Sequence, residues 1–189
     1  NFGSWSNSSS DTCDWIRDSG GTPSSNTGPS SGQSGSYYAF VETSNGYCYT
    51  NGDTAILEYE VDPAISGTIT FYYHMYGTNI GTLNVDEYDG SSWSNIWTLS
   101  GNQGNAWSSQ QSADFSSGTT KLRFHYTAAG GYLGDAAIDV VGIEKDDGLI
   151  SWSSGKYGSG LDFDGTDDYI GIGSTIPDVQ TVSFWMKAD

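Results

Sequence analysis

The stretch that decides the fold reads TITFYYHMYG, from Thr68 to Gly77. Within it, large apolar residues at 69, 71, 73 and 75 alternate with the residues at 68, 70, 72 and 74, a period of two that is typical of a β-strand. Aromatic and β-branched residues also favour a pleated, half-buried surface. The stretch therefore predicts a strand with one face in the core, not a helix.

Strands are predicted on both sides of this stretch, at short intervals. They cover residues 37–43, 54–61, 82–88, 92–99, 120–127 and 136–144, in addition to 68–76. Gly, Ser, Asn and Asp clusters separate them, and the Asp89-Gly90 pair predicts a hairpin. No helix-period segment of useful length appears. Many short strands with regular turns predict an all-β sandwich or barrel.

Further blocks give the chain a family resemblance. In order, they read DTCDW at 11–15, TPSSNTGP at 22–29, GSYYAFVETS at 35–44, FYYHMYG at 71–77, IGTL at 80–83, GNQGNAW at 101–107 and GDAAID at 134–139. In this order the blocks resemble a MAM domain. The resemblance implies an antiparallel jelly-roll β-sandwich over residues 1–145. It also implies a mostly non-catalytic role outside the cell.

A second pattern begins after residue 145. The segments YGSGLDFDGTDDYI at 157–170 and TVSFWMK at 181–187 resemble the opening strands of a laminin-G-like, concanavalin A-like lectin domain. Residues 146–189 are too few to close two sheets of that kind. We therefore expect a partial segment that packs on another surface, swaps between chains or is truncated.

The charge of the chain restricts its partners. The formal net charge is −17 at pH 7, with six Lys and Arg residues. Nucleic acids and anionic membranes need positive counter-charge, so the sequence excludes them as partners. The absence of a run of 18 apolar residues predicts no membrane insertion. The start of the chain lacks signal-peptide features, so we expect a piece of a longer, trimmed protein.

Cys13 and Cys48 are the only cysteines. An even number in a Ser/Gly/Thr-rich, Lys-poor chain of secreted character favours a disulfide over two buried thiols. MAM domains of animals usually have four cysteines, so this chain looks more like a bacterial version. The first 35 residues predict either a long ordered loop or a floppy one. A disulfide at Cys13, burial of Trp15 or a cation at Asp11 or Asp14 would each order it.

The resemblance implies a structural calcium ion between the N-terminal loop and the last strand. The matching residues are Asp11, Asp14, Glu42 and Asp139. An unpaired carboxylate at Asp139, inside an apolar strand, would be costly without a cation, although hydrogen bonds to a scaffold are an alternative. The family has a second acid where this chain has Val140. The acids at 162, 164, 167 and 168 lack the order of an EF-hand loop.

Catalysis has little support in the sequence. His74 and His125 each alternate with apolar neighbours on a strand, and no catalytic motif accompanies them. The chain contains seven Trp and thirteen Tyr residues, more than its core needs. Most should be core residues by alternation, but four lie near turns and are candidates for stacking on sugar rings: Tyr88, Trp93, Trp97 and Trp107.

Together these observations predict a non-enzymatic, extracellular module for adhesion or carbohydrate recognition. Its expected partners are a polysaccharide, or a glycan or protein of a cell surface, besides further domains of the same parent chain. Two alternatives stay open. One is an accessory or spacer domain of a secreted hydrolase or protease, and the other is a homophilic adhesion domain.

Overall fold

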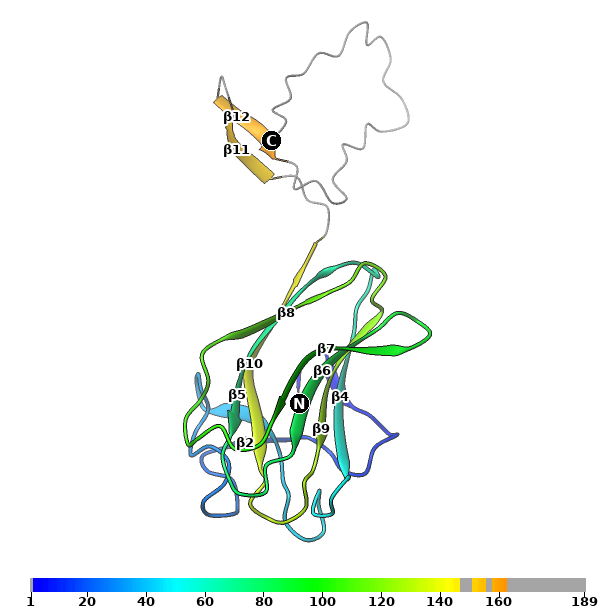
Figure 1. Ribbon diagram of the computed structural model, residues 1–189. Helices are drawn as coiled ribbons and strands as arrows, with labels where there is room; N and C mark the ends of the chain where they lie inside the picture. Colours follow the sequence, from blue (N-terminus) through cyan, green and yellow to red (C-terminus); the bar gives the residue numbers. More distant parts are fainter. Residues whose placement is uncertain (1, 147–150, 156–157, 163–189) are drawn as a thin grey trace, which may run out of the picture. The chain divides into compact units, whose positions relative to one another are not determined.

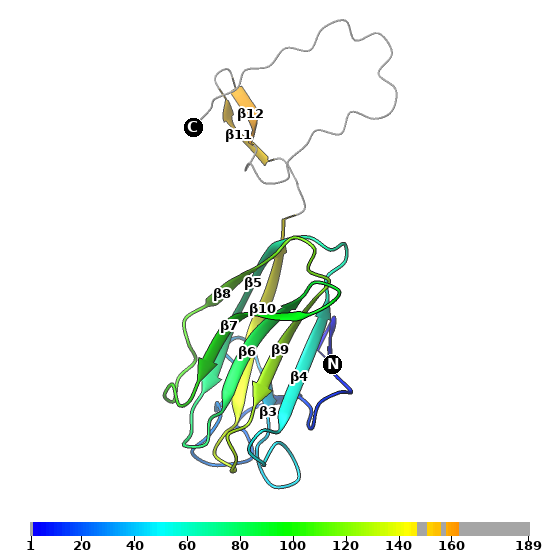
Figure 2. The ribbon, with the colours of Figure 1, turned by 45° about the vertical axis from the view of Figure 1, so that its right-hand side comes forward.

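A computed structural model describes residues 2–146, 151–155 and 158–162. The chain divides into two compact units, residues 1–146 and 147–189. The first unit is a sandwich of two five-stranded antiparallel sheets (Figures 1 and 2). Sheet A has the order β1 (Trp5–Asn7), β4 (Thr54–Glu60), β9 (Lys121–Thr127), β6 (Thr82–Tyr88) and β7 (Trp93–Ser100). Sheet B has the order β2 (Ile16–Ser19), β3 (Tyr37–Val41), β10 (Ala136–Lys145), β5 (Gly67–Met75) and β8 (Gln111–Phe115).

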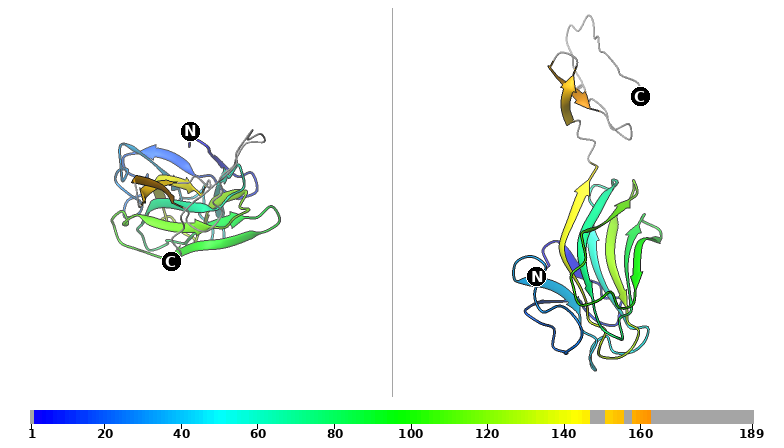
Figure 3. Two further views of the ribbon diagram at one scale, coloured as in Figure 1. Left: turned by 90° about the horizontal axis from the view of Figure 1, so that it is seen from above. Right: turned by 60° about the vertical axis from the view of Figure 1, so that its left-hand side comes forward.

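The core lies between the two sheets (Figure 3). Strand β5 buries Ile69, Phe71 and Met75 completely. The Phe71 ring meets the ring of Phe124 edge-on from sheet A, with 5.1 Å between centroids. Such T-shaped pairs add about 1 kcal/mol beyond the burial of their area. The apolar residues of the central stretch thus face the core, and the residues between them face the outer side of sheet B. The predicted all-β jelly-roll sandwich is confirmed.

All seven predicted strands are present, each within two residues at either end. The predicted hairpin is confirmed too, because β6 pairs with β7 and Tyr88 lies opposite Trp93. Three strands of the sandwich were not predicted: β1, β2 and β8. Their sequences, WSN, IRDS and QSADF, are short and largely polar, so they give almost no periodic signal.

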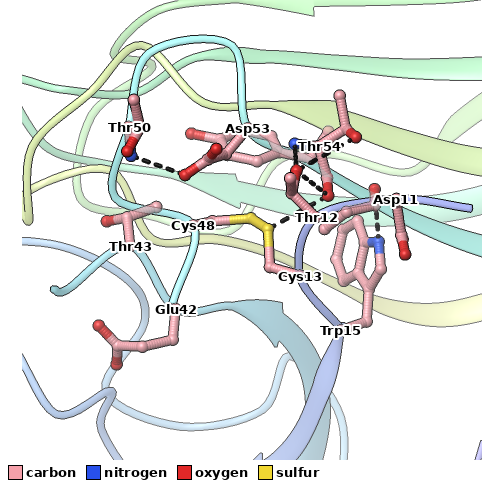
Figure 4. Close-up of a disulfide and its surroundings, with 12 residues drawn as sticks. Asp11, Thr12, Cys13, Trp15, Glu42, Thr43, Cys48, Thr50, Asp53 and Thr54 are labelled. Carbon is pink, nitrogen blue, oxygen red and sulfur yellow. Dashed lines mark hydrogen bonds between the residues drawn. A yellow bond between two sulfur atoms is a disulfide. The ribbon is translucent and has the colours of Figure 1, made fainter. Parts of the chain in front are cut away.

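The N-terminal segment is ordered by two of the three predicted ties. Cys13 and Cys48 form a disulfide, shown in Figure 4. Trp15 is buried, and its Nε1 donates a hydrogen bond to the carbonyl oxygen of Ala55 at 3.1 Å. Strands β1 and β2 then join the edges of the two sheets. The segment is a long ordered connection, not a floppy one.

The described part of the second unit is a hairpin. Strand β11 (Ser151–Gly155) pairs antiparallel with β12 (Gly158–Asp162). Most of the predicted lectin-like segment, including residues 163–189, lies outside the described residues. In the part of the chain that the structure describes, no helix is long and apolar enough to span a membrane.

Strand β10 contains one strained residue. Its pairing with β5 shifts register between Asp139 and Gly142, and Val140 in this bulge has a φ of 50°. The left-handed region costs an L-residue about 1–2 kcal/mol, and Asn tolerates it better than a β-branched residue.

We expect Val140→Asn to raise the free energy of unfolding by about 1 kcal/mol, measured by urea denaturation. Val140 is exposed, so the substitution leaves no cavity. The matched control is Val140→Thr, which keeps the branched Cβ and should not stabilise. An equal gain in both variants would contradict backbone strain as the cause.

Candidate functional site

The outer face of sheet A brings polar and aromatic side chains together. Successive side chains of β6, β7 and β9 point to opposite faces of the sheet, so the residues between the core residues point to the outer face. Asp86 pairs with both Asn95 and Arg123 across the strands, and Tyr88 lies opposite Trp93. We call these five residues, Asp86, Tyr88, Trp93, Asn95 and Arg123, the aromatic–polar patch.

Two contacts fix the Trp93 ring in the patch. The Tyr88 ring lies against it with 5.0 Å between centroids. The Arg123 guanidinium carbon lies over the Trp93 ring, 4.1 Å from its centroid. A guanidinium stacked on an indole is a favourable cation–π contact. The aromatic surface is therefore held in place by the protein before any ligand arrives.

Asp86 is the hydrogen-bonding centre of the patch. Its carboxylate accepts bonds from Arg123 Nε at 2.8 Å and from Asn95 Nδ2 at 2.9 Å, and His125 Nδ1 lies 3.6 Å away. Burial alone would raise the pKa of Asp86, but the interactions with His125, Asn95 and Arg123 outweigh it and lower the pKa. The carboxylate is thus ionised at neutral pH and fixes the Arg123 head group.

Of the four predicted stacking residues, Tyr88 and Trp93 lie in the patch. Trp97 faces the core instead, with its ring 5.0 Å from that of Phe71. Trp107 covers the outer face of sheet B, against the rings of Tyr38 and His74. The structure does not bring these last two tryptophans to the patch. His74 is buried, and its ring lies against that of Trp107 on sheet B. His125 lies on sheet A, beside Asp86.

A second cluster lies where β3 ends and β10 begins. Glu42 and Asp135, here called the acid pair, are 3% and 0% exposed. Asp135 Oδ1 accepts hydrogen bonds from the backbone nitrogen and the hydroxyl of Thr43, both at 3.0 Å. Glu42 Oε1 accepts one from the backbone nitrogen of Ser44 at 2.9 Å. The other oxygen of each carboxylate, Glu42 Oε2 and Asp135 Oδ2, is buried without a hydrogen-bond partner.

The acid pair is electrostatically unfavourable by itself. Burial raises the pKa of Asp135 to about 6, and the neighbouring Glu42 carboxylate contributes to the rise. The N-terminal loop covers the pair, because Thr27 Oγ1 accepts a hydrogen bond from the backbone nitrogen of Asp135 at 2.8 Å. Two unpartnered buried carboxylate oxygens are the donor type that a hard cation such as Ca²⁺ prefers. The acid pair thus offers two oxygen donors of the type that a calcium ion would use.

Two of the other predicted cation ligands, Asp11 and Asp139, accept hydrogen bonds from the backbone. Asp11 Oδ2 accepts a hydrogen bond from the backbone nitrogen of Ile56 at 2.6 Å. Asp139 Oδ2 accepts bonds from the backbone nitrogens of residues 33 and 34 at 2.8 and 3.1 Å. Asp14 is exposed. Among the described residues, no three His, Cys, Asp or Glu side chains gather closely enough to hold a metal.

Of the four predicted ligands, only Glu42 thus belongs to the acid pair. Its partner Asp135 was not predicted. The signal that could have identified Asp135 is its place directly before a strand of apolar residues, in the block GDAAID. Any further ligands of an ion at the acid pair would have to be backbone, hydroxyl or water oxygens.

Comparison with known proteins adds a family match. Residues 1–147 match the family model described as "MAM domain, meprin/A5/mu". MAM domain-containing glycosylphosphatidylinositol anchor protein 1 is 37% identical over 150 residues in both Rattus norvegicus and Homo sapiens, covering 71% of this chain. Neuropilin-1a of Danio rerio is 36% identical over 121 residues, covering 54% of this chain and 13% of its own length. The chain spans 15% of the length of the anchor proteins. These relatives are vertebrate proteins, and the bacterial affiliation stays a prediction.

Solved structures with the same architecture include two adhesin domains of Lys-gingipain. The K1 domain, from Porphyromonas gingivalis W83, has a TM-score of 0.55 at 16% identity and covers 76% of this chain and 91% of its own. The K2 domain has a TM-score of 0.55 at 15% identity, with coverages of 75% and 90%. At this identity the likeness shows the sandwich fold alone.

Proposed function

Since this chain belongs to the MAM domain family, we propose that it is a non-catalytic recognition module of an extracellular or cell-surface protein. We further propose that it binds glycans through the aromatic–polar patch. The disulfide supports an oxidising, extracellular setting. The names of the relatives describe membrane-anchored proteins, which supports a place at the cell surface.

The observation that carries the glycan proposal is the Tyr88–Trp93 pair, held against Arg123 and beside the Asp86 and Asn95 side chains. Aromatic rings provide an apolar face for the C–H groups of a sugar ring. A few fixed polar groups beside them give orientation through the hydroxyls. The patch combines both kinds of group on one sheet surface.

The charges of the patch favour an uncharged sugar. Arg123 is paired with Asp86, and the neighbouring Lys121 is paired with Glu60 at 2.8 Å. With a net charge of −17, the chain repels polyanions, and both Arg123 in the patch and Lys121 beside it are already neutralised by acidic partners. We therefore propose neutral polysaccharides as the ligand class.

We expect Trp93→Ala to weaken binding to the best ligand of a neutral polysaccharide panel at least tenfold, measured by isothermal titration calorimetry. The reason is the loss of the stacking surface that Tyr88 and Arg123 hold in place. The matched control is Tyr37→Ala, an exposed tyrosine of sheet B, which should leave the affinity unchanged. Equal binding by Trp93→Ala and the parent would contradict the patch as the site. Absence of any bound polysaccharide would favour a spacer role.

The family resemblance implies a structural calcium ion, and we also propose that the acid pair holds it, with Asp135 in place of the other ligands predicted beside Glu42. The support is the two buried oxygens, Glu42 Oε2 and Asp135 Oδ2, that have no hydrogen-bond partner. A bound cation would supply the positive charge that these two carboxylates lack. Glu42 and Asp135 would then tie the end of β3 to the start of β10 under the N-terminal loop.

A further inference from the structure

Three exposed tyrosines lie at one end of the sandwich. Among the described residues, five large hydrophobic side chains are exposed. Three of the five are Tyr47, Tyr49 and Tyr132, at 57%, 42% and 55% exposure. The first two are in the loop from residue 42 to 53, between β3 and β4, and Tyr132 is in the loop from 128 to 135, between β9 and β10. Both loops lie at the lower end of the sandwich in Figure 2.

The two loops are fastened to each other and to the core. The backbone nitrogen of Gly131 donates to the carbonyl oxygen of Tyr49 at 2.9 Å, and that of Gly52 donates to Ala128 at 2.9 Å. Between the two tyrosines of the first loop, Cys48 is buried and bonded to Cys13 (Figure 4). A ligand that binds here therefore orders little backbone, which lowers the entropic cost of association.

The charge at this end is one-sided. The two loops contain no Lys or Arg, and of their three acids Glu42 and Asp135 are buried while Asp53 is partly exposed. Strand β9 begins at Lys121 and runs toward the second loop, and β10 runs away from that loop to end at Lys145. Both lysines thus lie at the far end of the sandwich. The two loops of the tyrosine end thus carry no basic side chain, and their one partly exposed charged residue is Asp53.

We propose that Tyr47, Tyr49 and Tyr132 form a docking surface for a protein segment rich in Arg and Lys, distinct from the aromatic–polar patch. Tyrosine faces attract guanidinium and ammonium groups, and tyrosines on a rigid loop frame are a common means of protein recognition. The negative field of the chain speeds the encounter with a basic partner. A second copy of this chain, with its own charge of −17, is repelled.

The test uses the whole chain and a short peptide of alternating Arg and Gly residues, with an alternating Glu and Gly peptide as the negative probe. Affinity is measured by biolayer interferometry at physiological salt. We expect the triple variant Tyr47→Ser/Tyr49→Ser/Tyr132→Ser to bind the Arg peptide at least tenfold more weakly. The triple Phe variant, which keeps the rings, should stay within about twofold of the parent. Both variants keep the parent's net charge, so the difference reports the rings and not the field.

Tyr37→Ser is the matched control, because Tyr37 is exposed on sheet B and should not affect peptide binding. Circular dichroism confirms that each variant is folded. Equal binding of the Arg peptide by the triple Ser variant and the parent would overturn the proposal and leave only general charge attraction. The proposal would also be overturned if the three tyrosines were needed for binding a neutral polysaccharide, or for self-association in sedimentation. Because Trp93→Ala tests the patch, failure of either surface is distinguishable from failure of the other.

Discussion

Saturating calcium should raise the melting temperature of the metal-free protein by about 5–10 °C. An ion present at about 100 times its dissociation constant adds about 3 kcal/mol to the free energy of unfolding, which corresponds to such a shift in a domain of this size. The physical cause is the acid pair, in which Glu42 and Asp135 each bury one oxygen without a partner. Differential scanning calorimetry with EDTA and with calcium measures the shift.

Two matched variants locate the ion. Asp135→Asn removes one of the two buried charges and should abolish the calcium response. Asp139→Asn changes an acid whose oxygens cap backbone nitrogens, and the response should persist. Loss of the response in Asp139→Asn, together with its survival in Asp135→Asn, would show that the ion binds at the other predicted residues.

The acid pair also gives this prediction a dependence on pH. Because the folded-state pKa of Asp135 is about 6, against 3.8 ordinarily, the folded protein binds more protons than the unfolded chain between these values. In the metal-free protein, the protonated Asp135 therefore contributes fully to the free energy of unfolding below pH 4. This contribution, about 3 kcal/mol at most, is lost as the pH rises through 6. Comparison with Asp135→Asn isolates the effect from other titrating groups. Calcium should remove the loss, because it favours the ionised carboxylate.

Removal of the disulfide should lower the free energy of unfolding by about 4 kcal/mol, the value expected from chain entropy for a loop of this length. The bridge joins residues 35 apart in sequence. It fastens the N-terminal segment next to the buried Trp15, so the unfolded chain gains much freedom when the bond is absent. Urea denaturation of Cys13→Ala/Cys48→Ala against the parent measures the loss.

A reductant provides the control for this prediction. It should destabilise the parent by a similar amount and leave the double variant unchanged, which separates the bond from the packing of the two side chains. A double variant within about 1 kcal/mol of the parent would contradict a stabilising bridge.

The sequence predicted the fold well wherever side chains alternate. Strand β5 is an example, because its core residues are large and its outer residues include several polar ones. Strand β8 contributes only Ala113 and Phe115 to the core, too few for a period to be seen. Trp107 shows another limit. It lies in a loop, and alternation cannot tell that a loop residue folds over the outer face of sheet B.

The candidate site was predicted less completely, for a physical reason. An acid near a strand end can bind a cation, cap a backbone nitrogen or face water, and the choice depends on which backbone lies opposite. Asp11 and Asp139 accept hydrogen bonds from backbone nitrogens of distant segments, whereas Asp135 accepts one from Thr43 and also lies beside the buried Glu42. Tyr88 and Trp93 were named as stacking candidates because they lie near a turn, and the hairpin at that turn pairs them directly.

The position of Cys48 couples two proposed sites that share no other residue. Its sulfur belongs to the loop between Tyr47 and Tyr49, and its backbone nitrogen donates to the carbonyl oxygen of Glu42 at 3.0 Å. One disulfide therefore braces both the proposed ion ligand Glu42 and the tyrosines of the proposed docking surface. Breaking this one bond should therefore loosen the proposed calcium site and the proposed docking surface together, so we expect both to depend on oxidation of the two cysteines.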